Sequence, residues 1–186
     1  MPFTKPIISI ENVVATGTID QKLDLKDITK KFHHVEWRPD LFPGAVFRLR
    51  NPKTATLLFR TGKMVCTGAK SEELARKAVK TVVQKLRKGR IKIKKDATVT
   101  IQNLVASINL GGKISLEQAA RTLPRSMYEP EQFPGLIFRM LYPKTVILIF
   151  SSGKLVCTGG KTEKDVYRAV NQLHNLLEEK DLMIYD

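Results

Sequence analysis

The chain has 186 residues, and its hydrophobic content of 42% is enough for a sizeable core in one domain or two small ones. Its apolar runs fall short of the roughly 18 residues that a membrane span needs, and the N-terminus MPFTKPIISIEN lacks the segments of a secretory signal. We therefore expect a soluble intracellular protein without membrane contact. The net charge of +14 indicates a polyanionic partner.

The excess positive charge belongs to the first half of the chain. Residues 1–95 contain 22 Lys and Arg against 8 Asp and Glu, whereas residues 96–186 contain 10 of each kind. The two halves therefore differ in electrostatics, which gives the molecule a way to distinguish its two ends.

The two halves nevertheless repeat one pattern at an offset of 91 residues. From Ile10 to Val83 the offset holds without a gap, and about 27 of 74 aligned positions are identical. We assign a first repeat to residues 1–95, strongly basic, and a second repeat to 96–186, net neutral with an acidic tail. Two repeats are too few for a solenoid, so a single pseudo-twofold body is predicted.

Each repeat opens with a run rich in Val, Ile and Thr, IISIENVVATGTI and TVTIQNLVASINL, which predicts a strand. A helix is predicted next, because Leu25, Ile28 and Phe32 recur at helical spacing, as apolar residues do in the second copy. Short strands are predicted around HVEW, AVFRLR, ATLLF and MVCTGA, and Gly62 and Gly153 mark the last hairpins.

A strongly amphipathic helix closes each repeat. Leu74, Val79 and Leu86 belong to its apolar stripe in the first copy, and Ser71 is the predicted N-cap. Thr162 with Asp165 resembles a capping box in the second. The order strand, helix, strands, helix predicts an α+β unit with an antiparallel sheet.

The segments ATLLF and VILIF are apolar at nearly every residue, although an antiparallel sheet usually buries only one face. Two helices per repeat can cover one face, so the other should form an apolar binding surface. Cations recur beside these strands at matching positions: Arg48, Lys53, Lys63, Lys70, Arg139, Lys144, Lys154 and Lys161. Phosphates that flank an apolar contact are typical of the DNA minor groove, into which proteins insert Phe or Leu wedges.

The motif Phe-Pro-Gly occurs in both repeats, at Phe42 and Phe133. Because Pro and Gly mark turns, these rings either fold back into the core or enter a partner. The sequence leaves both alternatives open.

An enzyme is not expected. The three histidines, His33, His34 and His174, and the two cysteines show no metal-site spacing, and no phosphate loop or nucleophile-base pair is repeated. No cofactor is predicted. Cys66 and Cys157 occupy the same place in two copies of VCTG, which favours buried free thiols over a disulfide.

The blocks QNLVAS, YEPEQFPGLIFRM and PKTVILIFSSGKLVCTGGK, with their upstream copies, closely resemble the TATA-binding protein family over essentially the whole chain. The acidic tail EEKDLMIYD and the lack of a long N-terminal extension resemble its archaeal branch. The resemblance implies a saddle, with a curved antiparallel sheet of about ten strands, four helices on the convex face and DNA on the concave face. Minor-groove binding and kinking by this family is a known example of such recognition.

The resemblance also implies roles for individual residues, first as DNA wedges in two pairs, Phe42 with Phe59 and Phe133 with Phe150. The residues that would contact base edges are Asn12, Asn103, Thr67, Thr158, Val14, Val105, Leu57, Leu148, Val65 and Val156. Phosphate contacts are expected from Arg48, Arg139, Lys63 and Lys154, and docking of transcription factor B from Glu129, Glu131 and Gln132. These contacts would select A·T over G·C pairs.

A general transcription factor that binds the TATA box, bends it, and assembles with transcription factor B and, indirectly, RNA polymerase is therefore expected. It would act as a monomer on DNA. The sequence leaves open whether the free protein forms a homodimer. Its place would be the nucleoid-associated cytoplasm of an archaeon, or the nucleus if the source were eukaryotic.

Three alternatives stay open. The module could instead bind RNA or an RNA/DNA hybrid, or serve as a protein-interaction platform. A three-residue TGK turn places Leu57, Phe59, Val65 and Thr67 on one face, whereas a two-residue turn pairs Phe59 with Met64; the resemblance favours the first. The basic run KLRKGRIKIKK is either solvated or contacts flanking DNA or a protein.

Overall fold

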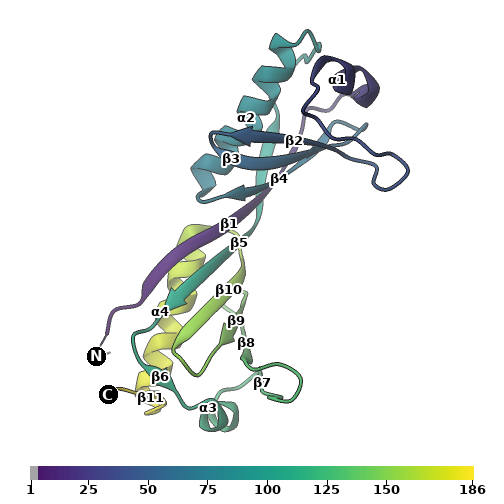
Figure 1. Cartoon of the computed structure of the whole chain (residues 1–186). Coiled ribbons are helices and arrows are strands. Elements are labelled where there is room, and N and C mark those ends of the chain that lie inside the picture. Colours follow the sequence, from purple (N-terminus) through teal and green to yellow (C-terminus); the bar gives the residue numbers. More distant parts are fainter. Residues whose placement is uncertain (1–3) are drawn as a thin grey trace. The chain divides into compact units, whose positions relative to one another are not determined.

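The protein was analysed as a computed structural model, which describes residues 4–186 (Figure 1). The first half of the chain forms one long strand, a short helix, three strands and a long helix. These elements are β1 (Ile7–Thr18), α1 (Leu25–Lys31), β2 (Ala45–Arg50), β3 (Lys53–Leu58), β4 (Lys63–Ala69) and α2 (Glu72–Lys88).

The second half repeats this order and adds short strands. Its elements are β5 (Thr98–Asn109), β6 (Lys113–Ile114), α3 (Leu116–Thr122), β7 (Ser126–Met127), β8 (Leu136–Met140), β9 (Thr145–Ile149), β10 (Lys154–Gly160), α4 (Glu163–Glu179) and β11 (Met183–Ile184). The helices predicted from apolar spacing therefore form where the sequence places them.

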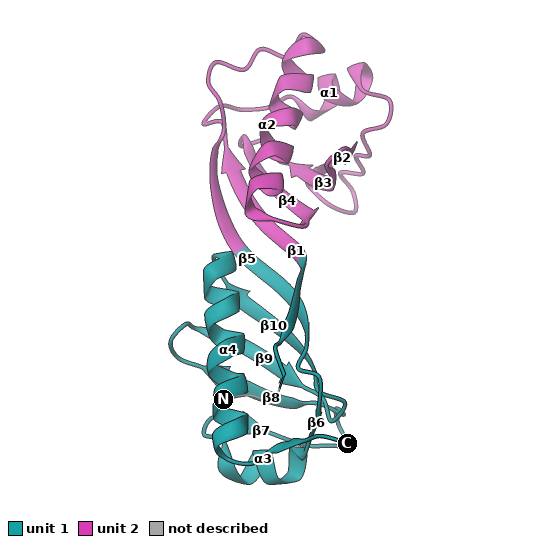
Figure 2. Cartoon of the chain, turned by 90° about the vertical axis from the view of Figure 1, so that its left-hand side faces the viewer, with its two compact units in different colours: residues 1–11, 103–186 teal, residues 12–102 magenta. Residues whose placement is uncertain are grey.

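The chain divides into two compact units (Figure 2). Unit 1 contains residues 1–11 and 103–186, and unit 2 contains residues 12–102. Both β1 and β5 cross a boundary, so each of these strands supplies residues to both units. The repeats 1–95 and 96–186 describe the duplicated sequence, and their division into domains stays a prediction.

Nine strands form one sheet in the order β2-β3-β4-β1-β5-β10-β9-β8-β7, and β6 pairs with β11 in a separate two-stranded sheet. Within each unit the pairings of the main sheet are antiparallel. The predicted α+β class with four helices is confirmed. The predicted strand at HVEW is reduced to a single bridge between Glu36 and Val46, which accounts for nine strands where about ten were expected.

In each unit the long helix covers one face of the sheet. The apolar stripe of α2 is buried, as are the alternate strand residues Leu58, Met64 and Cys66. The side chain of Ser71 accepts a hydrogen bond from the Leu74 amide, and Thr162 caps α4 in the same way. Both predicted N-caps are therefore present.

The hairpin between β3 and β4 settles the turn length. Leu57 lies opposite Val65, and the Phe59 amide donates to the Lys63 carbonyl at 3.0 Å, so residues 60–62 form a three-residue loop. Gly62 has a φ of +90°, and a Cβ atom there would overlap the Gln21 carbonyl. The three-residue length is therefore correct, although the loop is Arg60-Thr61-Gly62 and Lys63 already belongs to β4; Leu57, Phe59, Val65 and Thr67 share one face.

Both cysteines are buried free thiols, as predicted. Burial raises the pKa of Cys66, and it raises the pKa of Cys157 to about 12. A protonated, buried sulfur is a poor nucleophile, so these residues act as small apolar side chains of the core.

Candidate nucleic-acid interface

The sheet face that the helices leave uncovered carries a row of half-buried apolar side chains in unit 2. Val14 of β1, Leu57 of β3 and Val65 of β4 are each half-buried, whereas their strand neighbours Val13 and Leu58 are fully buried. Because strand residues alternate between faces, the first three must lie on the side away from α2. The three residues therefore share the face on which the resemblance places them, and their contact with bases stays a prediction.

Unit 1 has the same row. Val105, Leu148 and Val156 are half-buried, and Val156 pairs with Leu148 across β10 and β9. Their neighbours Ile149 and Cys157 are buried beneath α4. Two copies of one apolar floor thus lie on the uncovered face of the two units.

A pair of phenylalanines stands at the turn end of each row. The ring centroids of Phe42 and Phe59 are 6.0 Å apart at an interplanar angle of 65°, and those of Phe133 and Phe150 are 5.9 Å apart at 63°. Phe42 is 43% exposed and Phe133 is 37% exposed, so neither ring belongs to the core. The alternative in which these rings fold inward is wrong.

The glycines of Phe-Pro-Gly make room for these rings. A Cβ atom on Gly44 would lie 2.8 Å from the Phe42 ring and 3.0 Å from the Phe59 ring, and Gly135 has the same relation to Phe133 and Phe150. Neither glycine has a positive φ. Their role is therefore space for two rings rather than an unusual backbone, which the repeated motif alone did not reveal.

Asn12 is fixed by its neighbours across the sheet. Its Oδ1 accepts a hydrogen bond from the Gly68 amide at 2.6 Å, and its Nδ2 donates to the Thr67 hydroxyl at 3.0 Å. The Gly68 contact determines which amide atom is the oxygen, because a backbone N–H can only donate. Among the residues that the structure describes, Nδ2 has the Thr67 hydroxyl as its one acceptor.

Asn103 has the same arrangement in unit 1. The Gly159 amide donates to its Oδ1 at 2.7 Å, and its Nδ2 donates to the Thr158 hydroxyl at 3.2 Å. The asparagine and threonine predicted as base contacts are therefore adjacent in both units.

A strand irregularity produces this arrangement. The register of β4 against β1 shifts between Val13 and Ala15, next to Gly68, whose φ is +100°. Gly159, with a φ of +95°, marks the same shift in unit 1. Such bulges redirect a side chain or a backbone N–H. The repeated Thr-Gly after each cysteine was the available signal.

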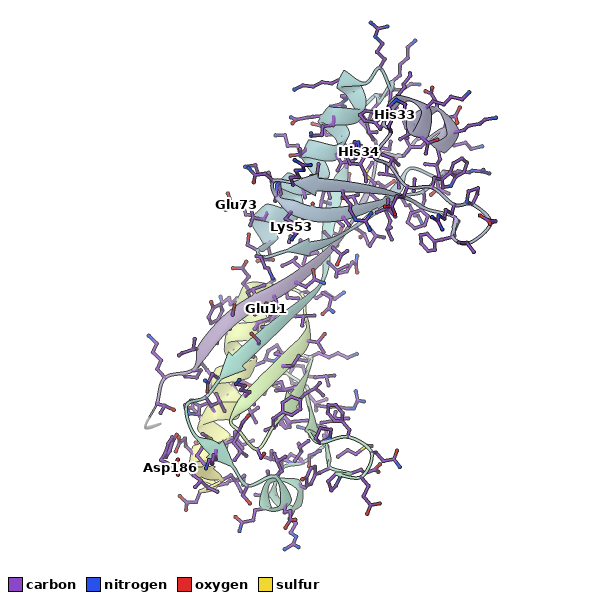
Figure 3. All side chains as sticks on the ribbon, in the orientation of Figure 1. Glu11, His33, His34, Lys53, Glu73 and Asp186 are labelled. Atoms are coloured by element: carbon purple, nitrogen blue, oxygen red, sulfur yellow. The ribbon has the colours of Figure 1, made fainter. Side chains whose placement is uncertain are left out.

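The residues before the two asparagines differ in charge. Glu11, which Figure 3 labels in β1, accepts a hydrogen bond from the Ser107 hydroxyl at 2.7 Å. Gln102 instead donates to the Thr16 hydroxyl at 2.9 Å. Glu11 thus precedes Asn12 in β1 at the position where Gln102 precedes Asn103 in β5.

The four predicted phosphate contacts are all exposed. Arg48 forms an ion pair of 3.1 Å with Glu36, and both side chains are more than half exposed. Within residues 4–186 no ion pair involves Arg139, Lys63 or Lys154. Of the four predicted phosphate contacts, Arg48 therefore already has a carboxylate partner.

The loops that precede the exposed rings share one backbone turn. The Gln132 and Phe133 amides both donate to the Glu129 carbonyl at 2.9 Å. In unit 2 the Leu41 and Phe42 amides donate to the Arg38 carbonyl at 3.0 and 2.9 Å. Glu129, Glu131 and Gln132 are exposed on this turn, whereas the matching residues of unit 2 are Arg38, Asp40 and Leu41, so only unit 1 carries a pair of acidic side chains here.

A hollow of about 740 Å³ lies beside Phe59 in unit 2, lined in part by Trp37, Pro39 and Pro43. The Arg60 guanidinium lies 5.6 Å from the Trp37 ring centroid. The corresponding hollow beside Phe150 in unit 1 has about 650 Å³ and is lined by serines at the matching turn. Trp37 was not predicted as a site residue, because a single tryptophan gives no repeated pattern.

The described part of the chain holds no group of three or more His, Cys, Asp or Glu able to bind a metal ion. His33 and His34 lie near α1, as Figure 3 shows, and His174 is buried on α4. As far as residues 4–186 are concerned, none of the helices has the length and apolar character of a membrane span.

Known proteins match the chain along most of its length. The family model described as "Transcription factor TFIID (or TATA-binding protein, TBP)" matches residues 7–89 and again residues 98–180. The TATA-box-binding protein of Pyrobaculum aerophilum is 52% identical over 174 residues, which are 94% of this chain and 87% of that protein. That of Sulfolobus acidocaldarius is 49% identical over 177 residues, or 95% and 90% of the two chains.

A solved structure is also similar. The Methanococcus jannaschii TBP shares 42% of its sequence with this chain and superposes with a TM-score of 0.83, covering 92% of this chain and 98% of that one. Sequence identity at this level over nearly the whole length, together with two matches to one family model, assigns the chain to a single family. The chain belongs to the TATA-binding protein family of transcription factors, and its relatives indicate an archaeal source.

Proposed function

We propose that the chain binds the minor groove of an A·T-rich promoter element with the uncovered face of its sheet. The observation that carries this proposal is the same row in both units, in which an apolar floor leads from a fixed asparagine to an exposed ring pair. The sugars of the minor groove supply a matching apolar surface with phosphates at its edges.

Selectivity for A·T pairs would come from the floor and the two asparagines. A·T and T·A pairs present the same N3 and O2 acceptors, which the free Nδ2 hydrogens of Asn12 and Asn103 can reach. A G·C pair would push its N2 amino group against Val14, Val65 and their counterparts, and a donor buried without a partner costs about 1–3 kcal/mol.

Bending would come from the ring pairs. Each pair presents one half-exposed and one half-buried ring at the edge of the floor, and a glycine without a side chain leaves space for both rings. Rings of this kind can enter a base step. Stacking of a base on the inserted ring then replaces the lost base–base stacking, which offsets much of the free energy of opening the step. The exposed Arg139, Lys63 and Lys154 would neutralise phosphates on either side, and Arg48 would join them on leaving Glu36.

Assembly of a transcription complex would use the acidic turn of unit 1. Glu129, Glu131 and Gln132 are exposed, and their counterparts in unit 2 are Arg38, Asp40 and Leu41, so the acidic pair is not duplicated. We propose that this turn binds transcription factor B, through which RNA polymerase is recruited, so that the complex acquires a direction. The protein would act as a monomer on DNA, in the nucleoid-associated cytoplasm of an archaeal cell.

A competition experiment tests the proposal. Labelled TATA duplex is bound to the protein and displaced with unlabelled TATA duplex, G·C duplex or RNA duplex, at low and at high salt. We expect TATA duplex to compete best and its advantage to persist at high salt, because phosphate contacts alone weaken steeply with salt. Equal competition by all three would overturn the proposal, and a preference for RNA duplex would favour the wide, shallow RNA groove instead.

A further inference from the structure

The excess charge of the first repeat lies mainly on the helix side of unit 2, away from the proposed DNA face. On α2, Lys77, Lys80 and Lys88 are exposed and spaced so that they share one side of the helix. The opposite side, which includes Val79 and Leu86, is buried against the sheet. Figure 2 shows α2 along one face of unit 2.

The basic segment that follows α2 is fixed in place. Gln21 binds it twice, donating to the Lys92 carbonyl at 2.8 Å and accepting from the Lys94 amide at 2.9 Å. Arg87 donates to the carbonyl of Ile93, whose side chain is buried. Lys92 and Lys94, on either side of buried Ile93, are both exposed. The run is therefore not a freely solvated tail.

Nearby carboxylates neutralise other cations and leave these lysines uncompensated. Asp96 pairs with Arg87 at 2.7 Å, and Asp20 pairs with Lys95 at 2.6 Å. Glu73, labelled in Figure 3, is an exposed carboxylate one turn before Lys77, so it offsets part of the charge of that one lysine. Six lysines form no ion pair within residues 4–186 and are called the lysine surface below: Lys77, Lys80, Lys85, Lys88, Lys92 and Lys94.

The fold itself does not require this charge, because unit 1 lacks it. The residues of unit 1 that match the lysine surface are Arg168, Asn171, Leu176, Glu179, Met183 and Tyr185. Only one of these six carries a positive charge. The equivalent helices α2 and α4 therefore carry two different surfaces.

The chemistry of the lysine surface fits phosphates better than a protein. None of the large hydrophobic residues that are exposed in residues 4–186 lies on α2 or in residues 89–95. The matching side of unit 1 does expose such residues, namely Tyr142 at 85%, Leu141 at 53% and Tyr167 at 46%. Protein interfaces bury an apolar centre from which lysine is depleted, whereas contacts to nucleic-acid backbones depend on lysine and arginine.

We propose that the lysine surface is a second nucleic-acid site, which binds the phosphates of a DNA duplex without reading its sequence. It lies on the other side of unit 2 from the apolar floor, so one protein can hold two duplexes. A chain bound here to ordinary DNA keeps its sheet face free to test a nearby promoter. This inference goes beyond the proposed function, because it needs neither A·T selectivity nor the ring pairs.

A two-duplex capture experiment tests this proposal with the full chain. TATA duplex is immobilised and saturated with protein, and capture of a labelled G·C duplex from solution is measured at several salt concentrations. We expect the wild type to capture G·C duplex. The slope of log K against log salt concentration should become shallower by about 0.9 for each phosphate contact that a substitution removes. Failure to capture G·C duplex, while the immobilised TATA duplex is still bound, would overturn the second site and leave the proposed function intact.

Matched variants locate the site. Lys77→Glu with Lys80→Glu should lower capture of G·C duplex by about tenfold or more, since each reversed charge replaces a phosphate attraction by a repulsion. The control is Arg168→Glu with Asn171→Glu, at the same positions of α4, which should change capture little. An equal loss in both variants would show a general effect of net charge and would contradict the proposal.

Two further measurements complete the test. Lys88→Gln with Lys92→Gln removes charge without adding any, and should lower both capture and the salt slope while TATA bending is unchanged. Polyglutamate should compete poorly with G·C duplex at equal charge concentration. Stronger competition by polyglutamate would assign the surface to an acidic protein and overturn the nucleic-acid proposal.

Discussion

The loop before Phe42 reads RPDL and the loop before Phe133 reads EPEQ, yet both close through the same backbone hydrogen bonds and hold their rings at the same spacing. The sheet faces agree almost residue by residue, whereas the loops and the helix sides differ in charge and in exposed apolar side chains. Duplication has thus preserved the surface that would meet a nearly symmetric ligand. It has allowed the surfaces that would meet other partners to diverge.

The strongest test of the agreement is to remove one exposed ring from each unit. Phe42→Ala and Phe133→Ala should weaken TATA binding to the same degree, by about 1–3 kcal/mol each, since each ring would stack on one base step. Bend-sensitive fluorescence on a doubly labelled TATA duplex measures the loss of bending. Unchanged bending in both variants would defeat the wedge mechanism, and loss in only one would show that the two ends act differently.

The difference between the loops is tested by charge reversal. Glu129→Lys with Glu131→Lys should leave TATA bending unchanged and lower recruitment of transcription factor B by about tenfold, because loss of a charged hydrogen bond costs about 1.5–3 kcal/mol. The matched control is Arg38→Glu in unit 2, which should leave recruitment intact. Native gel shifts with TATA duplex and transcription factor B measure the ternary complex. Unchanged recruitment would show that the dock lies elsewhere.

The two asparagines should contribute equally and more modestly. Asn12→Ala and Asn103→Ala remove a fixed Nδ2 donor and leave the Gly68 or Gly159 amide without its acceptor. We expect each to lower the preference for A·T over G·C duplex by about 1–2 kcal/mol. The ratio of the two dissociation constants gives this quantity. A variant that loses affinity for both duplexes equally would indicate a damaged fold rather than a lost base contact.

The smallest expected effect concerns the buried core of unit 1, whose stability should depend on pH at low pH where that of unit 2 does not. His174 is buried on α4, where unit 2 has Val83, and burial lowers its pKa although Glu178, 3.4 Å away, partly opposes this. The unfolded state then binds a proton more readily than the folded state. His174 should therefore lower the free energy of unfolding as the pH falls below about 6.5, whereas above that pH it should have no such effect. His174→Val should flatten this dependence by about 1 kcal/mol or less, measured by urea unfolding at several pH values.

Much of this architecture could be predicted from the sequence, because each motif in one repeat can be compared with the matching motif in the other. A lone Phe-Pro-Gly or a lone asparagine in a strand has many explanations, but Phe42 with Phe133 and Asn12 with Asn103 recur in the same context. Helix caps at Ser71 and Thr162 were predictable because the signal is local. The apolar floor followed from strands too apolar for one buried face.

Features set by pairing geometry could not be read in this way. Gly62 marks a turn, but only the hydrogen bond from Phe59 to Lys63 fixes the loop at three residues and hence the face of Leu57. The bulge at Gly68 depends on register with β1, which no single strand encodes. The contacts of Gln21 with Lys92 and Lys94 join residues more than 70 positions apart, so the basic run gave no sign of being anchored.

The crossing of β1 and β5 between the units has a consequence for cooperativity. Residues 7–11 of β1 belong to unit 1 although the rest of the strand completes unit 2, and residues 98–102 of β5 do the reverse. One end of the first strand of each repeat therefore belongs to the other unit, as in a domain swap within one chain. Neither unit can melt without withdrawing part of a strand from its neighbour, so a cut between the repeats would leave two incomplete folds rather than two separable modules.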